Sequence, residues 1–187
     1  MKELDNIICI SGKIAKDFQH SHKNYYTSIV HVERENGKID MIPIMFDIRI
    51  MEGITVGTYV SISGQIHHER KRKEEWKHYV FVNHINIIEN EQYEQMAYLS
   101  GTVYQKFEIN GKIKKLEFIL NMERGYKGIT DHITVYVLDK QYKMMVDVCI
   151  GDKIEMIGKL QSKQFVEKGT GKLRNAINVK LQHAQKI

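Results

Sequence analysis

Proline, cysteine and long apolar runs are scarce in this chain. Its single proline and thirteen glycines argue against a proline-rich linker or a low-complexity segment. No stretch approaches the ~20 consecutive apolar residues that a transmembrane helix needs. The acidic residues within Met1–Asn6 do not fit the start of a signal peptide. We therefore expect a globular protein of the cytoplasm.

Catalytic and metal-binding motifs are also missing. Cys9 and Cys149 lie far apart in apolar runs, so we expect two small buried hydrophobic residues and no disulfide or metal pair. The histidines at 20, 22, 67 and 68 lack the partnered cysteines or carboxylates of a metal site. No phosphate-binding loop, serine nucleophile motif or zinc-protease motif occurs. We expect no enzymatic activity, no cofactor and no metal.

The charge is unevenly distributed. The net charge is +5 and the pI about 9.0, which favours a polyanionic partner. Residues 1–89 hold 12 basic and 12 acidic side chains, whereas residues 90–187 hold 16 basic and 11 acidic ones. The whole excess, 16 − 11 = +5, therefore lies in the second half.

The two halves are repeats of each other. Four groups of residues in the first half recur in the same order in the second, at offsets that drift from 89 to 94 as small loop insertions would cause. The matches are Ser11-Gly12 with Ser100-Gly101, Val32-Glu33-Arg34 with Met122-Glu123-Arg124, Asp40 with Asp131, and Ser63-Gly64 with Ile157-Gly158. The chain is a duplication, and we predict domains at 1–89 and 96–187, joined by the short polar linker 90–95.

Each half is patterned as short strands. In the first half, apolar or alternating segments occur at 7–14, 25–32, 39–46, 59–66 and 79–88, and the only plausible helix lies at 47–55. Five strands with a helix between the third and the fourth is the order of the oligonucleotide/oligosaccharide-binding (OB) fold. We therefore predict an all-β protein of two tandem five-stranded OB barrels, each with one short helix between strands 3 and 4.

Several of these segments resemble the bacterial single-stranded DNA-binding protein family. The resemblance is carried by Ile7–Ile14, by Asp40-Met41-Ile42-Pro43-Ile44, and by Gly151–Leu160, which continues through a basic and aromatic arm at 161–172. It implies sequence-tolerant binding of single-stranded DNA in replication, recombination or mobile-element maintenance. Family members with two barrels per chain form dimers, so it also implies a homodimer that presents four OB units.

The sequence departs from the family at the stacking positions. The family stacks bases on tryptophans and a phenylalanine, but the corresponding residues are Met41, Asp47 and Lys71 in the first half. We therefore expect this chain to bind single-stranded DNA more weakly than the family does, or at other residues, since stacking contributes ~1–3 kcal/mol per base. The family's acidic C-terminal tip, which recruits replication proteins, has no counterpart in Gln182–Ile187, so recruitment by that route is not expected.

The candidate binding residues combine cations with aromatic or stackable side chains. The first basic arm, at 69–77, and the second, whose charges span 159–174, each have an alternative reading as a solvated hairpin. The second arm is the stronger candidate because only Glu167 opposes its five positive charges. In the first half the candidates are Arg34, Met41, Arg70, Lys71, Arg72, Lys73, Trp76 and Tyr79. In the second half they are Arg124, His132, Lys159, Lys163, Phe165, Lys168, Lys172 and Arg174.

Two of these assignments leave an alternative open. Arg34 and Arg124 recur at equivalent places, where each suits either a phosphate contact or an ion pair with Asp40 or Asp131. Met41 and His132 face the groove if the family alignment holds. Phe18 and Phe107 also recur, and we expect both in the core.

Two other functions remain open. An OB pair that has lost its stacking residues could act as a protein-interaction module, as in the primosomal replication protein N family. RNA binding by the same groove is the other alternative, because phosphate and stacking contacts do not test the 2′-hydroxyl.

Overall fold

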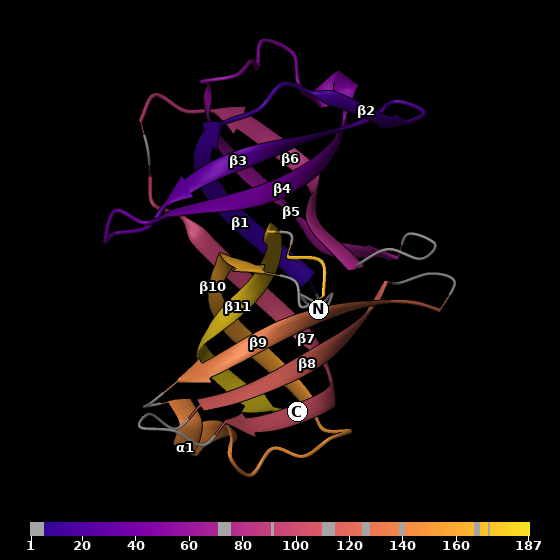
Figure 1. Cartoon of the computed structure of the whole chain (residues 1–187), viewed down its shortest axis with the longest axis vertical. Helices are drawn as coiled ribbons and strands as arrows, with labels where there is room; N and C mark the ends of the chain where they lie inside the picture. The colour runs from indigo at the N-terminus through magenta and orange to yellow at the C-terminus, as the bar shows by residue number, and fades with distance from the viewer. Residues whose placement is uncertain are drawn as a thin grey trace. The chain divides into compact units, whose positions relative to one another are not determined.

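The computed structural model describes most of the chain (Figure 1). It covers residues 6–70, 76–90, 92–109, 115–124, 128–138, 141–166, 169–171 and 173–187, with 69, 70, 76, 77, 173 and 174 described by their backbone only. The chain divides into two compact units. The first-repeat unit consists of Ile8–Gln95 and Gln161–Ile177, and the second-repeat unit of Met1–Ile7, Met96–Leu160 and Asn178–Ile187. The predicted boundaries at 89 and 96 stay a prediction.

The first repeat forms a closed five-stranded barrel. Its strands are β1 (Asn6–Ile14), β3 (Tyr25–Glu33), β4 (Ile39–Asp47), β5 (Tyr59–Arg70) and β6 (Trp76–Ile87). Antiparallel pairing joins β1 to β3, β3 to β4, β5 to β6 and β5 to β1, and a parallel pair of β4 with β6 closes the ring. This order of strands is that of an OB fold, as predicted. An additional strand that the sequence did not predict, β2 (Gln19–His22), pairs with β3.

Alternation along each strand separates the core from the outer face. On β3, Ser28, Val30 and Val32 are buried, while Tyr25, Thr27, Ile29 and His31 are only half-buried. The residues that point inward on the other strands are similarly apolar. Those with no more than 1% exposure include Ile8, Ile10, Ile14, Ile42, Ile44, Phe46, Val60, Ile62, Ile66 and Val80.

Recurring glycines mark places where two strands approach closely. A Cβ atom at Gly12 would collide with the carbonyl oxygen of His31, and one at Gly101 would collide with the carbonyl oxygen of Asn121. The two glycines are equivalent in the repeats, so the physical requirement is duplicated along with the residue. This explains why the match at Ser11-Gly12 and Ser100-Gly101 is among the clearest in the sequence.

The strands of the second repeat pair in the same order as those of the first. They are β7 (Gln95–Ile109), β8 (Lys115–Arg124), β9 (Ile129–Leu138), β10 (Lys153–Val166) and β11 (Leu173–Lys186). Antiparallel pairing joins β7 to β8, β8 to β9 and β7 to β10, β9 pairs with β11 in parallel, and β10 neighbours β11. The outer parts of β10 and β11 belong to the first-repeat unit.

The helices are shorter than predicted. In place of a helix over 47–55, the first repeat has a single 3₁₀ turn, η1 (Ile48–Ile50), in which the carboxylate of Asp47 accepts a hydrogen bond from the amide of Arg49 at 3.0 Å. A longer helix is disfavoured by β-branched residues and by Gly53, whose φ is +72°. The second repeat has a four-residue helix, α1 (Tyr142–Met145). Within the described residues, no helix has the length and apolar character needed to cross a membrane.

The prediction that both cysteines are buried is wrong for Cys149. Cys9 is half-buried on β1, whereas Cys149 is exposed, and both are free thiols. The apolar run around Cys149 forms the turn that precedes β10, not a strand, so Ile150 beside it is also 64% exposed.

Candidate nucleic-acid interface

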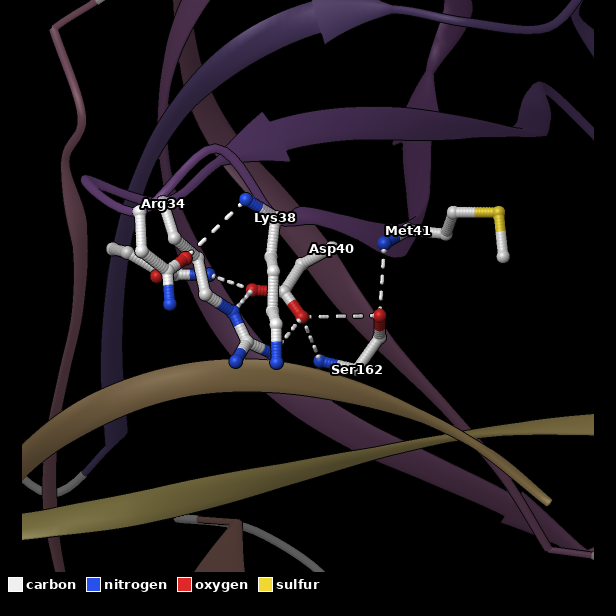
Figure 2. Close-up of polar contacts among 7 residues, drawn as sticks. Arg34, Lys38, Asp40, Met41 and Ser162 are labelled. Carbon is white, nitrogen blue, oxygen red and sulfur yellow. Dashed lines mark hydrogen bonds and ion pairs between the residues drawn. The ribbon is translucent and has the colours of Figure 1, made fainter.

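The first-repeat unit contains a fully buried carboxylate, that of Asp40 on β4. Arg34 follows β3 and pairs with it bidentately, with Nε to Oδ2 at 2.6 Å and an Nη to Oδ1 at 2.5 Å. The Arg34 side chain is 24% exposed and that of Asp40 is 0% exposed. The hydrogen bonds to Asp40 raise the pKa of Arg34. The pair therefore holds a compensated, buried charge at the start of β4 (Figure 2).

Segments distant in sequence also bind Asp40. The amide of Ser162, on the outer part of β10, donates to Oδ1 at 2.7 Å, and its hydroxyl is 3.1 Å from the same oxygen. The Nε2 of Gln95 donates to Oδ2. The amide of Met41 in turn donates to the Ser162 hydroxyl at 2.9 Å, while its side chain points away from the carboxylate (Figure 2). Asp40 thus ties the start of the second arm to β4.

An equivalent ion pair forms in the second repeat. Arg124 donates to Asp131 with distances of 2.6 and 2.5 Å, and Asp131 is fully buried. Of the two alternatives for Arg34 and Arg124, the ion pair is the one that the structure shows. Their role as phosphate contacts stays a prediction.

Four rings form a continuous series on the outer face of the first-repeat barrel. Tyr25 lies 5.6 Å from Phe81, which stacks on His67 at 5.2 Å with an interplanar angle of 18°, and His67 meets Tyr79 edge-on at 5.9 Å. These centroid distances fall within the range of favourable aromatic pairs. All four side chains are half-buried. We call Tyr25, Phe81, His67 and Tyr79 the aromatic ladder.

Strand register brings the ladder together. His67 on β5 lies opposite Tyr79 on β6, and Phe81 follows two residues later on the same face. The parallel pairing of β4 with β6 sets Phe81 beside Met45, and the β3–β4 register places Tyr25 opposite Asp47. The ladder therefore runs across neighbouring strands, and no sequence segment contains more than two of its members.

The ladder has a further aromatic neighbour on β2, because the ring of His22 is 5.2 Å from that of Tyr25. Two other ring pairs belong to the opposite face of β3 and to the core. The ring of His20 is 5.2 Å from that of Tyr26, which also contacts the buried Phe46, and Phe18 packs edge-on against Phe46 at 5.0 Å. The unpredicted strand β2 therefore adds one ring, His22, beside the ladder. No group of three or more possible metal ligands occurs among the residues that the structure describes.

Two positions of the ladder carry lysine in the second repeat. Lys115 occupies the place of Tyr25, because it lies opposite Leu138 as Tyr25 lies opposite Asp47. Lys180 takes the place of Phe81, because β9 and β11 pair as β4 and β6 do. Both lysines are exposed. The two repeats thus differ in the chemistry of this face.

The second repeat keeps one aromatic pair near a predicted site residue. His132 is half-buried on β9, and its ring is 5.7 Å from that of Tyr104. Phe107, expected in the core, is 49% exposed instead. It lies on the part of β7 that extends beyond the barrel, where it pairs with Glu117.

The first predicted arm lies largely outside the described residues. Nothing is described for Lys71, Arg72 and Lys73, and only the backbone is described for Arg70 and Trp76, which oppose each other at the ends of β5 and β6. Tyr79 is the predicted residue of this arm that the structure places in the ladder.

The second predicted arm is described in part. Lys163 and Phe165 are exposed on β10, Phe165 by 42%, while Lys159 is half-buried. Lys168 and Lys172 lie outside the described residues, and Arg174 is described by its backbone only. The binding role of these residues stays a prediction.

Sequence reasoning missed three of the four ladder residues. No cluster of positive charge lies beside Tyr25 or Phe81 in the sequence. A basic run begins at Arg70, three residues after His67. The signal was the alternation of Tyr79-Val80-Phe81, which sets two aromatic rings on one face of a strand. Its partners could be found only by knowing the strand register.

The architecture is that of single-stranded DNA-binding proteins with OB folds. The structure of the single-stranded DNA-binding protein from Thermus aquaticus superposes with a TM-score of 0.73, at 11% sequence identity, over 97% of this chain and 92% of that chain. A deletion mutant of the same protein gives a TM-score of 0.74 at 11% identity, over 97% of this chain and 94% of that chain. The likeness in fold that the sequence indicates is confirmed.

Other comparisons are weaker. The N-terminal domain of PriB from Thermoanaerobacter tencongensis covers 46% of this chain and 98% of its own, with a TM-score of 0.41 at 26% identity. No protein-family model matches the sequence, and no curated protein matches it at a significant level.

Proposed function

We propose that this protein binds single-stranded DNA without sequence selectivity, and that bases stack on the aromatic ladder. The observation that carries the proposal is the ordered contact of Tyr25, Phe81, His67 and Tyr79 on one outer face. A protein that holds a single strand without reading its sequence uses aromatic rings of this kind, since every base has a π-face that can stack on them.

The strands hold the ladder in place before any ligand arrives. Each ring is half-buried and has at least one ring neighbour, so little side-chain freedom remains to be lost on binding. Stacking contributes ~1–3 kcal/mol per base. Two stacked bases therefore supply enough free energy for measurable binding once phosphate contacts are added.

We place the phosphate contacts on basic residues of both repeats. The exposed Lys163 lies two residues before the exposed Phe165 on β10, which combines a cation with a ring. Lys115 and Lys180 occupy the face of the second repeat that corresponds to the ladder. The predicted arm residues Arg70, Lys71, Arg72 and Lys73 and Lys168, Lys172 and Arg174 complete this set of candidates.

The proposal includes a tandem of two OB barrels in each chain, with domains at 1–89 and 96–187. It is supported by the shared order of strand pairing in the two repeats. The superposition with the Thermus aquaticus protein covers 97% of this chain, so it includes both repeats. We further propose that the chain forms a homodimer and acts in replication, recombination or mobile-element maintenance. Light scattering tests the dimer against a monomer mass of 22.0 kDa.

Anisotropy of a labelled oligo-dT tests the ladder. Phe81→Leu keeps most of the apolar volume and removes the π-face, so we expect about tenfold weaker binding. Phe107→Leu is the matched control, because Phe107 is exposed on the second repeat and is not a ladder residue. Equal affinity of the two variants would place the stacking surface elsewhere, and no binding by the wild type would overturn the function.

A protein-interaction role for the second repeat is the second candidate. Tyr104, Phe107 and Ile109 are 51%, 49% and 44% exposed along β7, and exposed apolar side chains close together favour a protein partner. The control variant Phe107→Leu tests this role as well, since it should weaken a protein complex without changing DNA affinity. A parallel titration with an RNA oligonucleotide tests whether the same surface accepts a 2′-hydroxyl.

A further inference from the structure

A row of four side chains crosses the outer face of the first-repeat barrel at a distance from the ladder. Lys13 on β1 lies opposite both His31 on β3 and Tyr59 on β5, and His31 lies opposite Met41 on β4. The residue that follows each of them in its strand is fully buried, so the four side chains point outward. We call Met41, His31, Lys13 and Tyr59 the Lys13 row.

Lys13 is the cation of this row, and Tyr59 holds it in position. The Nζ atom of Lys13 lies 4.7 Å from the centroid of the Tyr59 ring, which is within the range of a cation–π contact. Lys13 is exposed and Tyr59 is half-buried, so the ring orients an ammonium group that keeps its access to solvent. A lysine held in this way loses less side-chain freedom when it binds an anion.

The row is connected to the ladder along β3 and β4. Tyr25 of the ladder and His31 of the row lie on the same face of β3, six residues apart, which is about 20 Å at ~3.3 Å per residue. Between them, the half-buried side chains on this face of the two strands are Thr27, Ile29 and Pro43. A DNA strand that leaves the ladder along this face of β3 and β4 therefore meets no acidic side chain of these strands before it reaches the row.

The other end of the row adjoins the second arm. The amide of Met41 donates to the hydroxyl of Ser162 at 2.9 Å (Figure 2), and the exposed Lys163 follows Ser162 on β10. Both segments belong to the first-repeat unit. The acidic residue of β3 on this face, Glu33, lies two positions beyond His31, on the side away from the ladder. The row therefore links the ladder to the arm.

We propose that Lys13 binds a phosphate of the DNA strand that stacks on the ladder, and that Tyr59 positions its ammonium group for this contact. The inference rests on the proposed function and adds a binding site to it. Lysine binds phosphate as a compact charge with three donors. The strand runs from the ladder along β3 and β4 to the Lys13 row and continues towards the arm at Lys163.

The salt dependence of binding tests the phosphate contact, with an oligo-dT of about 16 nucleotides, the upper end of the site size of one OB fold. Lys13→Gln removes the charge and keeps most of the side-chain length, so we expect about fivefold weaker binding at low salt. The slope of log K against log salt should fall by about 0.7. Lys143→Gln is the matched control, because Lys143 is an exposed lysine on α1 outside the proposed binding surfaces. It should bind with the wild-type affinity and slope.

A double-mutant cycle tests the positioning role of Tyr59. Tyr59→Leu keeps the charge of Lys13 and removes the ring beside it, so we expect about threefold weaker binding at low salt. Combined with Lys13→Gln, the loss of the ring should weaken binding no further, because the ring acts through Lys13. Full additivity of the two losses would overturn the positioning role.

Acetylation of lysines tests the contact in the wild-type chain, without any substitution. With the same oligo-dT bound, Lys13 should react several-fold more slowly with an amine-specific acetylating reagent than in the free protein. Lys143 should react at the same rate in both states. Mass spectrometry of the peptides measures the two rates.

Two results would overturn the inference. One is a wild-type salt slope in Lys13→Gln, and the other is equal acetylation of Lys13 with and without bound DNA. In both cases the proposed function would stand, provided that the wild type binds DNA and Phe81→Leu weakens that binding. Absence of oligo-dT binding by the wild type would instead remove the proposed function and this inference with it.

Discussion

Ser162 donates both its backbone amide and its hydroxyl to one oxygen of Asp40, at 2.7 and 3.1 Å. The two residues are 122 positions apart in the sequence, and the acceptor is fully buried. A surface arm of the second repeat is therefore fixed to the first-repeat barrel by a carboxylate that the sequence duplicates in each repeat.

Removal of the Ser162 hydroxyl should destabilise the first-repeat unit. Ser162→Ala deprives the amide of Met41 of its acceptor and Asp40 of one donor, which costs about 1–3 kcal/mol when the groups stay buried. Urea unfolding measures the change. Ser21→Ala, at an exposed serine of β2, is the control and should unfold at the wild-type midpoint. Equal midpoints for both variants would show that the contact contributes nothing.

The two arginine–aspartate pairs of the first repeat should differ greatly in their effect on stability. Arg34→Met leaves the buried carboxylate of Asp40 without its cation, at a cost of about 3–5 kcal/mol. Arg49→Met breaks a pair in which the arginine side chain is 77% exposed, and we expect a change within experimental error. The free energy of unfolding of each variant measures the two costs. Similar losses of stability in both variants would show that burial of the carboxylate does not determine the cost of removing its arginine.

The salt dependence of DNA binding should separate phosphate contacts from stacking. Lys163→Ala should reduce the slope of log K against log salt by about 0.7, as expected for one lost phosphate contact on a single strand. Phe81→Leu should weaken binding at every salt concentration and leave the slope unchanged, because no ion is released by stacking. A changed slope in Phe81→Leu would contradict its assignment as a stacking residue.

Loss of the arm should affect binding less than loss of the ladder at high salt. The double substitution Lys163→Ala with Phe165→Ala removes one cation and one ring that is 42% exposed. Tyr79→Leu with Phe81→Leu removes two rings of the ladder, and we expect it to abolish the salt-resistant part of the affinity. Oligo-dT titrations at low and high salt compare the two. Greater loss at high salt in the arm variant would favour the arm as the stacking surface.

The fold could be predicted from the sequence because its requirements are local and are repeated. Gly12 and Gly101 meet the same steric limit against a neighbouring carbonyl oxygen, so each copy confirms the pattern of the other. The helix at 47–55 could not be predicted correctly. A weak amphipathic pattern does not outweigh Gly53 and the β-branched residues beside it, and only the turn at Ile48–Ile50 forms.

The candidate site could be predicted only in part, because its geometry depends on register between strands. Charge clusters are visible in the sequence, and they predict binding residues in the two arms and in the second repeat. Tyr25 and Phe81 meet only through the pairing of β3 with β4 and of β4 with β6. The contact of Ser162 with Asp40 is equally hidden, since no periodicity links residues so far apart.

The most direct test of the central claim is photocrosslinking of the full chain to an oligonucleotide that contains 5-iodouracil, followed by mass spectrometry of the crosslinked peptides. Stacked rings are the groups that lie against the base. We predict crosslinks at Tyr25, His67, Tyr79 or Phe81, and their loss when unlabelled single-stranded DNA competes. Crosslinks confined to other residues, with all four ladder residues unmodified, would contradict the account.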